Sequence, residues 1–174
     1  MLYVIRHGQV DTNIKNKVNG WNEEKLNSVG IQQAINARNQ LKNIKIDVVF
    51  CSPLLRTKQT YNNLNIKGVP IFYDDRIKER NSNNMVYANV ETLDEKIWYD
   101  KTQKSIYKDS EGFKSIIDRT ESMLKYIKNN YKDKNVLIVT HGDICKAIYL
   151  YFNPQIQDIS KFQQNNCEII SYDF

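Results

Sequence analysis

Both histidines of this 174-residue chain stand in the same local setting. His7 and His141 each come just after a short apolar run, and each is followed directly by glycine. An imidazole with one unprotonated nitrogen can attack an electrophile, or it can stabilise charge on a group that is being transferred. Arg6 precedes the first histidine, and a planar guanidinium matches the oxygens of a phosphoryl group. These residues therefore predict chemistry on an anionic group.

Four further residues fit the same chemistry. Arg56 could hold a tetrahedral dianion from a second side, Asn13 could add an amide donor, and Gly142 could add the backbone N–H of a helix start. Glu79 is the candidate acid for a leaving alkoxide. Nearby arginines would disfavour protonated His7 and keep it available for attack. From the residues alone, the inference ends at an anion-binding site with a nucleophilic histidine.

The elements that must position these residues alternate along the chain. Apolar runs predict strands at 2–5, 46–52, 71–77, 135–140 and 168–172. Helical spacing predicts helices at 29–42, 52–64, 110–131 and 142–152, with Ser28 and Ser52 as N-caps of the first two. The alternation favours an α/β fold, a three-layer sandwich whose central sheet is mostly parallel and flanked by helices.

Polar clusters follow four of the predicted strands, at 6–8, 52–56, 76–79 and 140–142. Ligands of such sheets bind at the carboxyl ends of the strands, so we expect the clusters to converge on one pocket. Gly8 is expected to let the backbone approach a phosphate closely.

Residues 81–109 have no clear period and are predicted to form an irregular or helical insertion over one end of the sheet. The aromatic residues of this insertion suit either stacking on a substrate or packing of the insertion against the body; they include Trp98, Tyr99 and Tyr107. The length and the 41% hydrophobic content fit a single domain over 1–174.

The composition narrows the function classes. The net charge of +5 is spread along the chain without a basic run or binding motif, so no nucleic-acid partner is expected, although the charge could steer an anionic substrate. Three widely spaced cysteines indicate neither a disulfide framework nor a zinc site, and no metal or other cofactor is expected. The absence of a long apolar stretch or leader predicts no membrane contact and a cytoplasmic protein. The oligomeric state is not indicated.

Several ordered motifs resemble the histidine phosphatase superfamily, which has the phosphoglycerate mutase-like fold. RHGQVDTN resembles its signature, and the likeness continues through GWNEEKLNSVGIQQA, SPLLRTKQT, DDRIKER and VLIVTHGD. The resemblance implies that His7 is the phosphohistidine nucleophile and that Glu79 is the proton donor. It also implies that the phosphoryl group is bound by Arg6, Arg56 and His141, with Asn13 assisting.

The resemblance implies a metal-independent phosphatase acting on a small phosphorylated metabolite. Family phosphoglycerate mutases share the RHGQ and Gly20-Trp21 features, but they are longer and carry an adjacent arginine pair that is missing between 81 and 118. A mutase, a protein phosphohistidine phosphatase and a non-catalytic phosphate-binding module are the alternatives. The chain departs from the family after Glu79, where it reads RNSNNM, and at 110–112, so the substrate is expected to be selected by 81–112.

Overall fold

A five-stranded sheet forms the centre of the computed structural model, which describes residues 1–107 and 109–173. Its strands are β1 (Leu2–Arg6), β2 (Val48–Cys51), β3 (Ile71–Tyr73), β6 (Val136–Thr140) and β7 (Ile169–Tyr172). They lie in the order β3-β2-β6-β1-β7, and all are parallel to their neighbours except β7, which runs antiparallel to β1. Strand β6 (VLIVT) is buried throughout, as expected of a strand covered on both faces.

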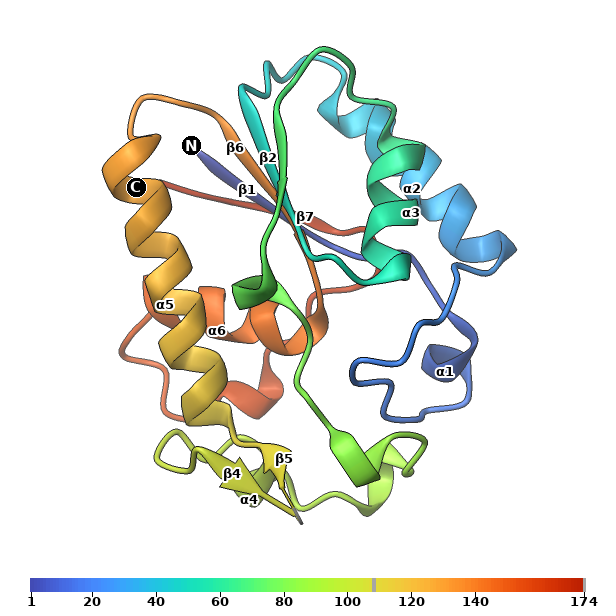
Figure 1. Ribbon diagram of the computed structural model, residues 1–174, viewed down its shortest axis with the longest axis vertical. Coiled ribbons are helices and arrows are strands. Elements are labelled where there is room, and N and C mark those ends of the chain that lie inside the picture. Colours follow the sequence, from blue (N-terminus) through green and yellow to red (C-terminus); the bar gives the residue numbers. More distant parts are fainter. Residues whose placement is uncertain (108, 174) are drawn as a thin grey trace.

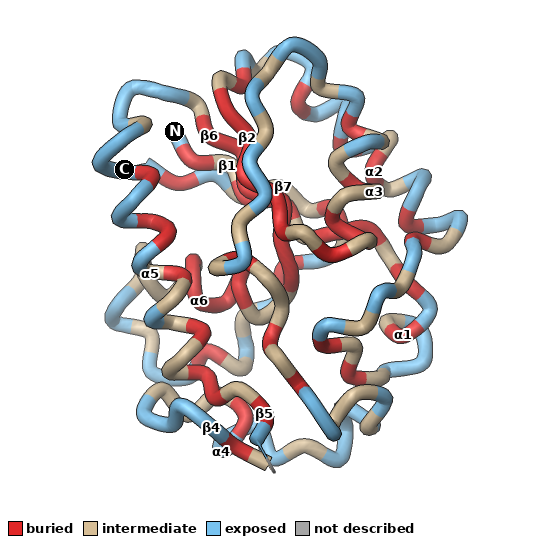
Figure 2. Tube along the Cα trace, in the orientation of Figure 1, coloured by how far each residue is buried: buried red, intermediate tan, exposed pale blue. Residues whose placement is uncertain are grey.

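Helices cover both faces of this sheet (Figure 1). On one face lie α5 (Phe113–Asn130) and α6 (Gly142–Phe152), and on the other lie α2 (Ser28–Leu41) and α3 (Leu55–Leu64). Each face has its own apolar core, one built around Met123, Leu124 and Ile148 and the other around Ala34, Leu64 and Val139. The buried chain in Figure 2 accordingly follows the strands and the inner faces of the helices. The predicted three-layer α/β sandwich is confirmed.

Two helices begin at other residues than the sequence predicts, α2 one residue earlier and α3 later. The N-cap of α2 is Asn27, whose side chain accepts a hydrogen bond from Gly30 N, so the predicted cap at Ser28 is wrong by one residue. Helix α3 begins at Leu55 and not at residues 52–53. The Ser52 hydroxyl lies 2.7 Å from His141 Nε2 and 3.5 Å from Leu54 N, so its closer contact is with the histidine.

The third strand and the long helix are also shorter than predicted. Strand β3 ends at Tyr73 because the Asp74 carboxylate accepts a bond from Arg76 N and starts a 3-10 turn at Asp75–Ile77. Helix α5 begins at Phe113, since Ser110–Glu111 forms β5 and pairs with β4 (Ser105–Ile106).

None of the helices in the described part of the chain combines the length and the apolar character that a membrane span requires.

The segment 81–109 combines short helical turns with one strand of the small hairpin. It contains 3-10 turns at Asn83–Met85 and Val90–Thr92, helix α4 (Glu95–Trp98) and strand β4. Of its aromatic residues, Trp98 packs on Tyr107 with ring centroids 6.0 Å apart, and Tyr99 packs edge-on against Phe113 at 5.4 Å. Trp98 is only 6% exposed, so these rings serve to pack the insertion against the body.

The sequence did not predict the one-turn helix α1 (Asp11–Ile14).

Candidate active site

The sheet register brings the two histidines together. Strands β1 and β6 are parallel neighbours with Arg6 opposite Thr140, so His7 and His141 leave the sheet side by side. The backbone N–H of His7 donates to the Thr140 carbonyl over 2.9 Å, and the two imidazole centroids lie 5.2 Å apart. Both histidines are buried. The shared setting of the two histidines in the sequence thus corresponds to two adjacent strand ends.

The hydrogen bonding of His7 identifies its free ring nitrogen. Nδ1 lies 2.8 Å from the Gly8 carbonyl, and because a carbonyl can only accept, Nδ1 carries the hydrogen. In the neutral ring Nε2 is then unprotonated. Burial, followed by the charges of Arg56 and Arg6, holds the pKa of His7 well below its usual value. The side chain is therefore a neutral imidazole with one available lone pair at physiological pH.

The two predicted arginines flank this imidazole and are anchored by backbone carbonyls. Arg6 donates from Nη1 to Gln164 O over 2.8 Å, whereas Arg56 donates from Nη1 and Nη2 to Asn22 O (3.0 Å) and Gly20 O (2.8 Å). Burial lowers the pKa of Arg56 to about 10, which still leaves it charged at neutral pH. Both guanidiniums are thus fixed in position before any ligand arrives.

Three buried nitrogens of these residues have no hydrogen-bond partner among the described residues. They are Arg6 Nε, Arg56 Nε and His141 Nδ1; the other ring nitrogen of His141 lies 2.7 Å from Ser52 Oγ. Burial, then the Arg56 and His7 charges, lower the pKa of His141 well below its usual value. An unsatisfied buried polar group costs about 1–3 kcal/mol, so this arrangement suits a ligand with several acceptor oxygens.

Glu79 is held at the cavity by its own backbone as well as by its carboxylate. Its carbonyl accepts from Trp21 Nε1 over 2.7 Å and from Arg119 Nη2 over 3.1 Å. Its Oε1 accepts the backbone N–H groups of Arg80 (2.9 Å) and Asp143 (3.3 Å). Burial, followed by the Asp143 charge, raises the pKa of Glu79 against the opposite effect of the arginines. This favours the protonated form that a general acid requires.

The remaining predicted residues lie at the same end of the sheet. Asn13 sits on α1, and its Oδ1 accepts from Val10 N over 3.1 Å. Gly142 is the first residue of α6, at the positive end of the helix dipole. A Cβ added at Gly142 would come no closer than 3.7 Å to its neighbours, and the nearest of them is Arg6 Nε. Gly142 therefore lies against the guanidinium group.

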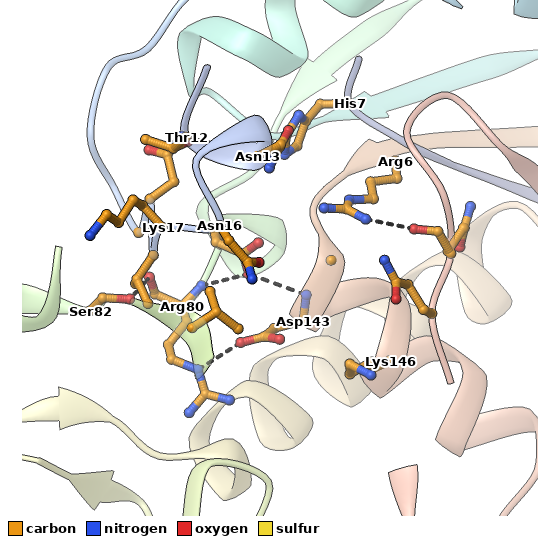
Figure 3. Close-up of a pocket in the computed structure, with 18 of the residues that line it drawn as sticks. Arg6, His7, Thr12, Asn13, Asn16, Lys17, Arg80, Ser82, Asp143 and Lys146 are labelled. Atoms are coloured by element: carbon orange, nitrogen blue, oxygen red, sulfur yellow. Dashed lines mark hydrogen bonds and ion pairs between the residues drawn. The ribbon is translucent and has the colours of Figure 1, made fainter. Parts of the chain in front are cut away.

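A cavity of about 430 Å³ lies where the predicted site residues meet (Figure 3). Six of the seven predicted site residues line it, namely Arg6, His7, Asn13, Arg56, Glu79 and Gly142. The seventh, His141, is fully buried and lies beside the His7 ring. The insertion contributes Trp98 and Tyr99 to the wall, and residues 163–166 contribute four carboxamides. The predicted residues therefore gather at one site.

The role of Gly8 differs from the prediction. A Cβ at Gly8 would lie 2.5 Å from the Gly30 carbonyl oxygen, and a Cβ at Gly30 would lie 2.2 Å from Gln9 O. Gly8 is therefore required where the loop after β1 packs directly on the start of α2. Its backbone N–H donates to Thr60 Oγ1 over 2.9 Å.

An ion pair at the cavity wall was not predicted. Arg80 Nε lies 2.7 Å from Asp143 Oδ2, and both side chains are largely buried, at 1% and 13% exposure (Figure 3). The partners are 63 positions apart, and each directly follows a predicted site residue, Glu79 or Gly142. That adjacency was the one sequence signal that could have indicated them.

Among the described residues, no group of three or more histidine, cysteine, aspartate or glutamate side chains could hold a metal ion.

Comparison with known proteins identifies the family of this chain. The family model described as histidine phosphatase superfamily (branch 1) matches residues 2–174. An uncharacterized phosphatase, PhoE of Bacillus subtilis, is 30% identical over 83% of this chain and 73% of its own. A 2,3-bisphosphoglycerate-dependent phosphoglycerate mutase of Cytophaga hutchinsonii is 29% identical over 87% and 76%. The structure of a phosphoserine phosphatase mutant from Entamoeba histolytica with phosphoserine superposes with a TM-score of 0.80, at 26% identity over 97% and 87%. The chain belongs to the histidine phosphatase superfamily.

Proposed function

We propose that this protein is a metal-independent phosphatase that hydrolyses phosphomonoesters through a phosphohistidine on His7, with Glu79 as proton donor. The observation that carries the proposal is the free Nε2 of a neutral His7 beside three unpartnered nitrogens, on Arg6, Arg56 and His141. Such a set combines a nucleophile with donors for the non-bridging oxygens of one phosphoryl group.

In the first step, Nε2 of His7 attacks phosphorus. A P–N bond forms while the bond between phosphorus and the ester oxygen breaks, and Glu79 gives its proton to that oxygen. The Arg6 and Arg56 guanidiniums balance charge on the group in transfer, and the neutral His141 ring, Asn13 and the Gly142 N–H hydrogen-bond to it. The alcohol then leaves, and Glu79 is ionised.

In the second step, water takes the place of the alcohol. The Glu79 carboxylate accepts a proton from this water as its oxygen attacks phosphorus, and the P–N bond breaks. Inorganic phosphate is released with His7 neutral and Glu79 protonated, so the starting state is restored without an external reductant, oxidant or metal.

The substrate is proposed to be a small phosphorylated metabolite, enclosed by 81–109 as part of a single domain over 1–174. The cavity volume of about 430 Å³ and the wall residues supplied by the insertion support this. The phosphatase relative and the structure solved with phosphoserine fit the same class. The Cytophaga relative favours phosphoglycerate mutase as the second candidate. Incubation with phosphoglycerate isomers separates the two, because sustained interconversion without phosphate release would indicate the mutase.

Substitution of the nucleophile tests the mechanism. We expect His7→Ala to abolish release of 4-nitrophenol from 4-nitrophenyl phosphate and to retain the fold by circular dichroism. Rapid quench of the unaltered protein should trap an acid-labile, base-stable phosphoenzyme that His7→Ala lacks. Asp118→Asn, on the exposed face of α5, is a control that should retain both activity and phosphoenzyme. Turnover that persists in His7→Ala would contradict the proposal. So would the absence of turnover in the unaltered protein.

A further inference from the structure

Asp143 carries a charge at the cavity wall that the mechanism above does not use. Its Oδ2 accepts from Arg80 Nε over 2.7 Å, and its Oδ1 is 3.4 Å from the Tyr99 hydroxyl. Burial and the Asp143 charge raise the pKa of Tyr99, so this hydroxyl remains a donor. Both carboxylate oxygens therefore face protein donors. This carboxylate is a fixed charge, and it is not arranged as a proton donor or as a ligand.

The same residue is joined directly to the proposed acid. The backbone N–H of Asp143 donates to Glu79 Oε1, which also accepts from the backbone of Arg80. Glu79 Oε2 has no hydrogen bond within the described part of the chain, so it is the oxygen left to carry the transferable proton. Asp143 and Arg80 thus hold one oxygen of Glu79 through their backbones and form an ion pair with their side chains.

We propose that Asp143 is a positioning residue of this reaction: its carboxylate, fixed by Arg80 and Tyr99, keeps Glu79 in the proton-carrying form that the leaving oxygen needs. The inference rests on the proposed phosphatase function and adds a residue to it. Asp143 acts through Glu79 and does not touch the reacting atoms.

The charges around Glu79 give the direction of this effect. Asp143, from α6, is the negative group that raises the pKa of the Glu79 carboxyl beyond what burial does. Arg56 of α3 and Arg6 of β1 act in the opposite sense. Tyr99 faces the same carboxyls as a neutral phenol. Arg119 of α5 binds the Glu79 carbonyl. Lys78 and Arg80 are the neighbours of Glu79 in the chain. Cys145 of α6 is a buried thiol, and burial raises its pKa, so it stays neutral. Removal of the Asp143 charge leaves burial alone to oppose the two arginines, so the pKa of Glu79 falls.

Arg80 prevents Asp143 from turning away. Its guanidinium is 1% exposed, lies 4.1 Å above the Trp98 ring and donates from Nη1 to the Glu111 carbonyl. The charge of Asp143 is thereby tied to α4 and to the small hairpin of β4 and β5. A rotation of Asp143 toward solvent would leave this buried guanidinium without its counter-ion, which is strongly unfavourable.

Asp143→Asn tests the proposal because it is nearly isosteric and removes only the charge. The measurement is kcat/KM against pH for two substrates: an alkyl phosphate, whose leaving oxygen needs a proton, and 4-nitrophenyl phosphate, whose leaving group needs none. We expect activity on the alkyl ester to be lost at a lower pH in the variant, since Glu79 must be protonated to act. At neutral pH its rate should fall about 3- to 10-fold, a part of the 10²–10⁴-fold contribution of a general acid, and the aryl ester should change less than about twofold.

The substrate ratio and the pH midpoint do not depend on the fraction of folded enzyme, so a partial loss of structure cannot imitate the result. Asp118→Asn removes one charge from the exposed face of α5 and should leave both quantities unchanged. Asp143→Asn combined with Arg80→Met, which removes both charges of the buried ion pair, is the second variant if Asp143→Asn does not fold, with the same expectation. An unshifted basic limb, or equal slowing of both esters, would overturn the role of Asp143. Absence of turnover in the unaltered protein would instead refute the phosphatase function itself.

Discussion

Glu79→Gln removes proton transfer by residue 79, both to the leaving oxygen and from the attacking water, and keeps the hydrogen bonds of this residue to the protein. Glu79 Oε1 accepts two backbone N–H groups, from Arg80 and Asp143, and a glutamine Oε1 can accept both in the same way. The amide nitrogen then takes the place of Oε2 and has no acidic proton to give. The backbone contacts of residue 79 with Trp21 and Arg119 involve its carbonyl and are unaffected. The substitution therefore changes the chemistry and preserves the geometry.

The size of the effect should depend on the leaving group. General acid catalysis contributes roughly 10²–10⁴-fold, so we expect kcat/KM for an alkyl phosphate, which reports the step that releases the alcohol, to fall by about that factor. In free energy this is about 3–5 kcal/mol of lost transition-state stabilisation, at about 1.4 kcal/mol per tenfold. For 4-nitrophenyl phosphate the nitrophenolate leaves without a proton, and we expect a loss below about tenfold.

Steady-state release of inorganic phosphate, measured for both esters at several pH values, checks this prediction. The matched control is Glu121→Gln, which removes a carboxylate that forms an ion pair with Lys125 on the surface of α5 and should leave both rates unchanged. Equal slowing of the two esters would remove Glu79 from the acid role. It would leave Glu79 as a residue that only shapes the site.

Two further predictions concern stability. Gly30→Ala places a methyl group 2.2 Å from the Gln9 carbonyl oxygen, so we expect urea unfolding to show a loss of about 1–3 kcal/mol. An unchanged midpoint would contradict the close approach of that loop to α2. Because the pKa values of His7 and His141 are depressed below 6.5 in the fold, the unfolded chain takes up more protons as the pH falls below 6.5, and the free energy of unfolding should fall with it. The free energy of unfolding should change by at most about 1.4 kcal/mol per pH unit for each histidine. This dependence on pH should be weaker in His141→Asn. The same dependence in that variant would contradict a neutral buried His141.

Much of the fold is local in origin and could be predicted. The buried strands are continuous, mostly apolar runs, and the long helices repeat apolar residues with the period of a helix, so both patterns can be recognised without tertiary information. Element ends were less predictable because tertiary contacts decide them. Ser52 is a good N-cap by type, yet its hydroxyl faces His141, 89 positions away, and α3 begins at Leu55.

The candidate site divides in the same way. The predicted residues follow strand ends, and parallel strands place such ends at one edge of a sheet, so their convergence could be anticipated. The pairing of Arg80 with Asp143 could not be anticipated, since it depends on how the segment that follows β3, helix α6 and the insertion meet in space. The same holds for Gly8, whose small size matters for packing against Gly30. A sequence pattern gives residue types, whereas these contacts depend on packing between distant segments.

The position of Arg80 has a consequence for how the acid and the substrate-selecting region can vary. Glu79 and Arg80 are adjacent, and Arg80 bonds both to Asp143 and to the carbonyl of Glu111 in β5, which pairs with β4 of the insertion. A change in the insertion that moves Trp98 or the hairpin would move the guanidinium that fixes Asp143, and with it the charge that acts on Glu79. A change at the arginines and histidines of the strand ends would instead alter how the phosphoryl group is held. In the proposed mechanism, substrate choice and acid strength are therefore coupled through one buried ion pair, whereas the register of β1 and β6 separately places Arg6 and the two histidines proposed to act on the phosphoryl group.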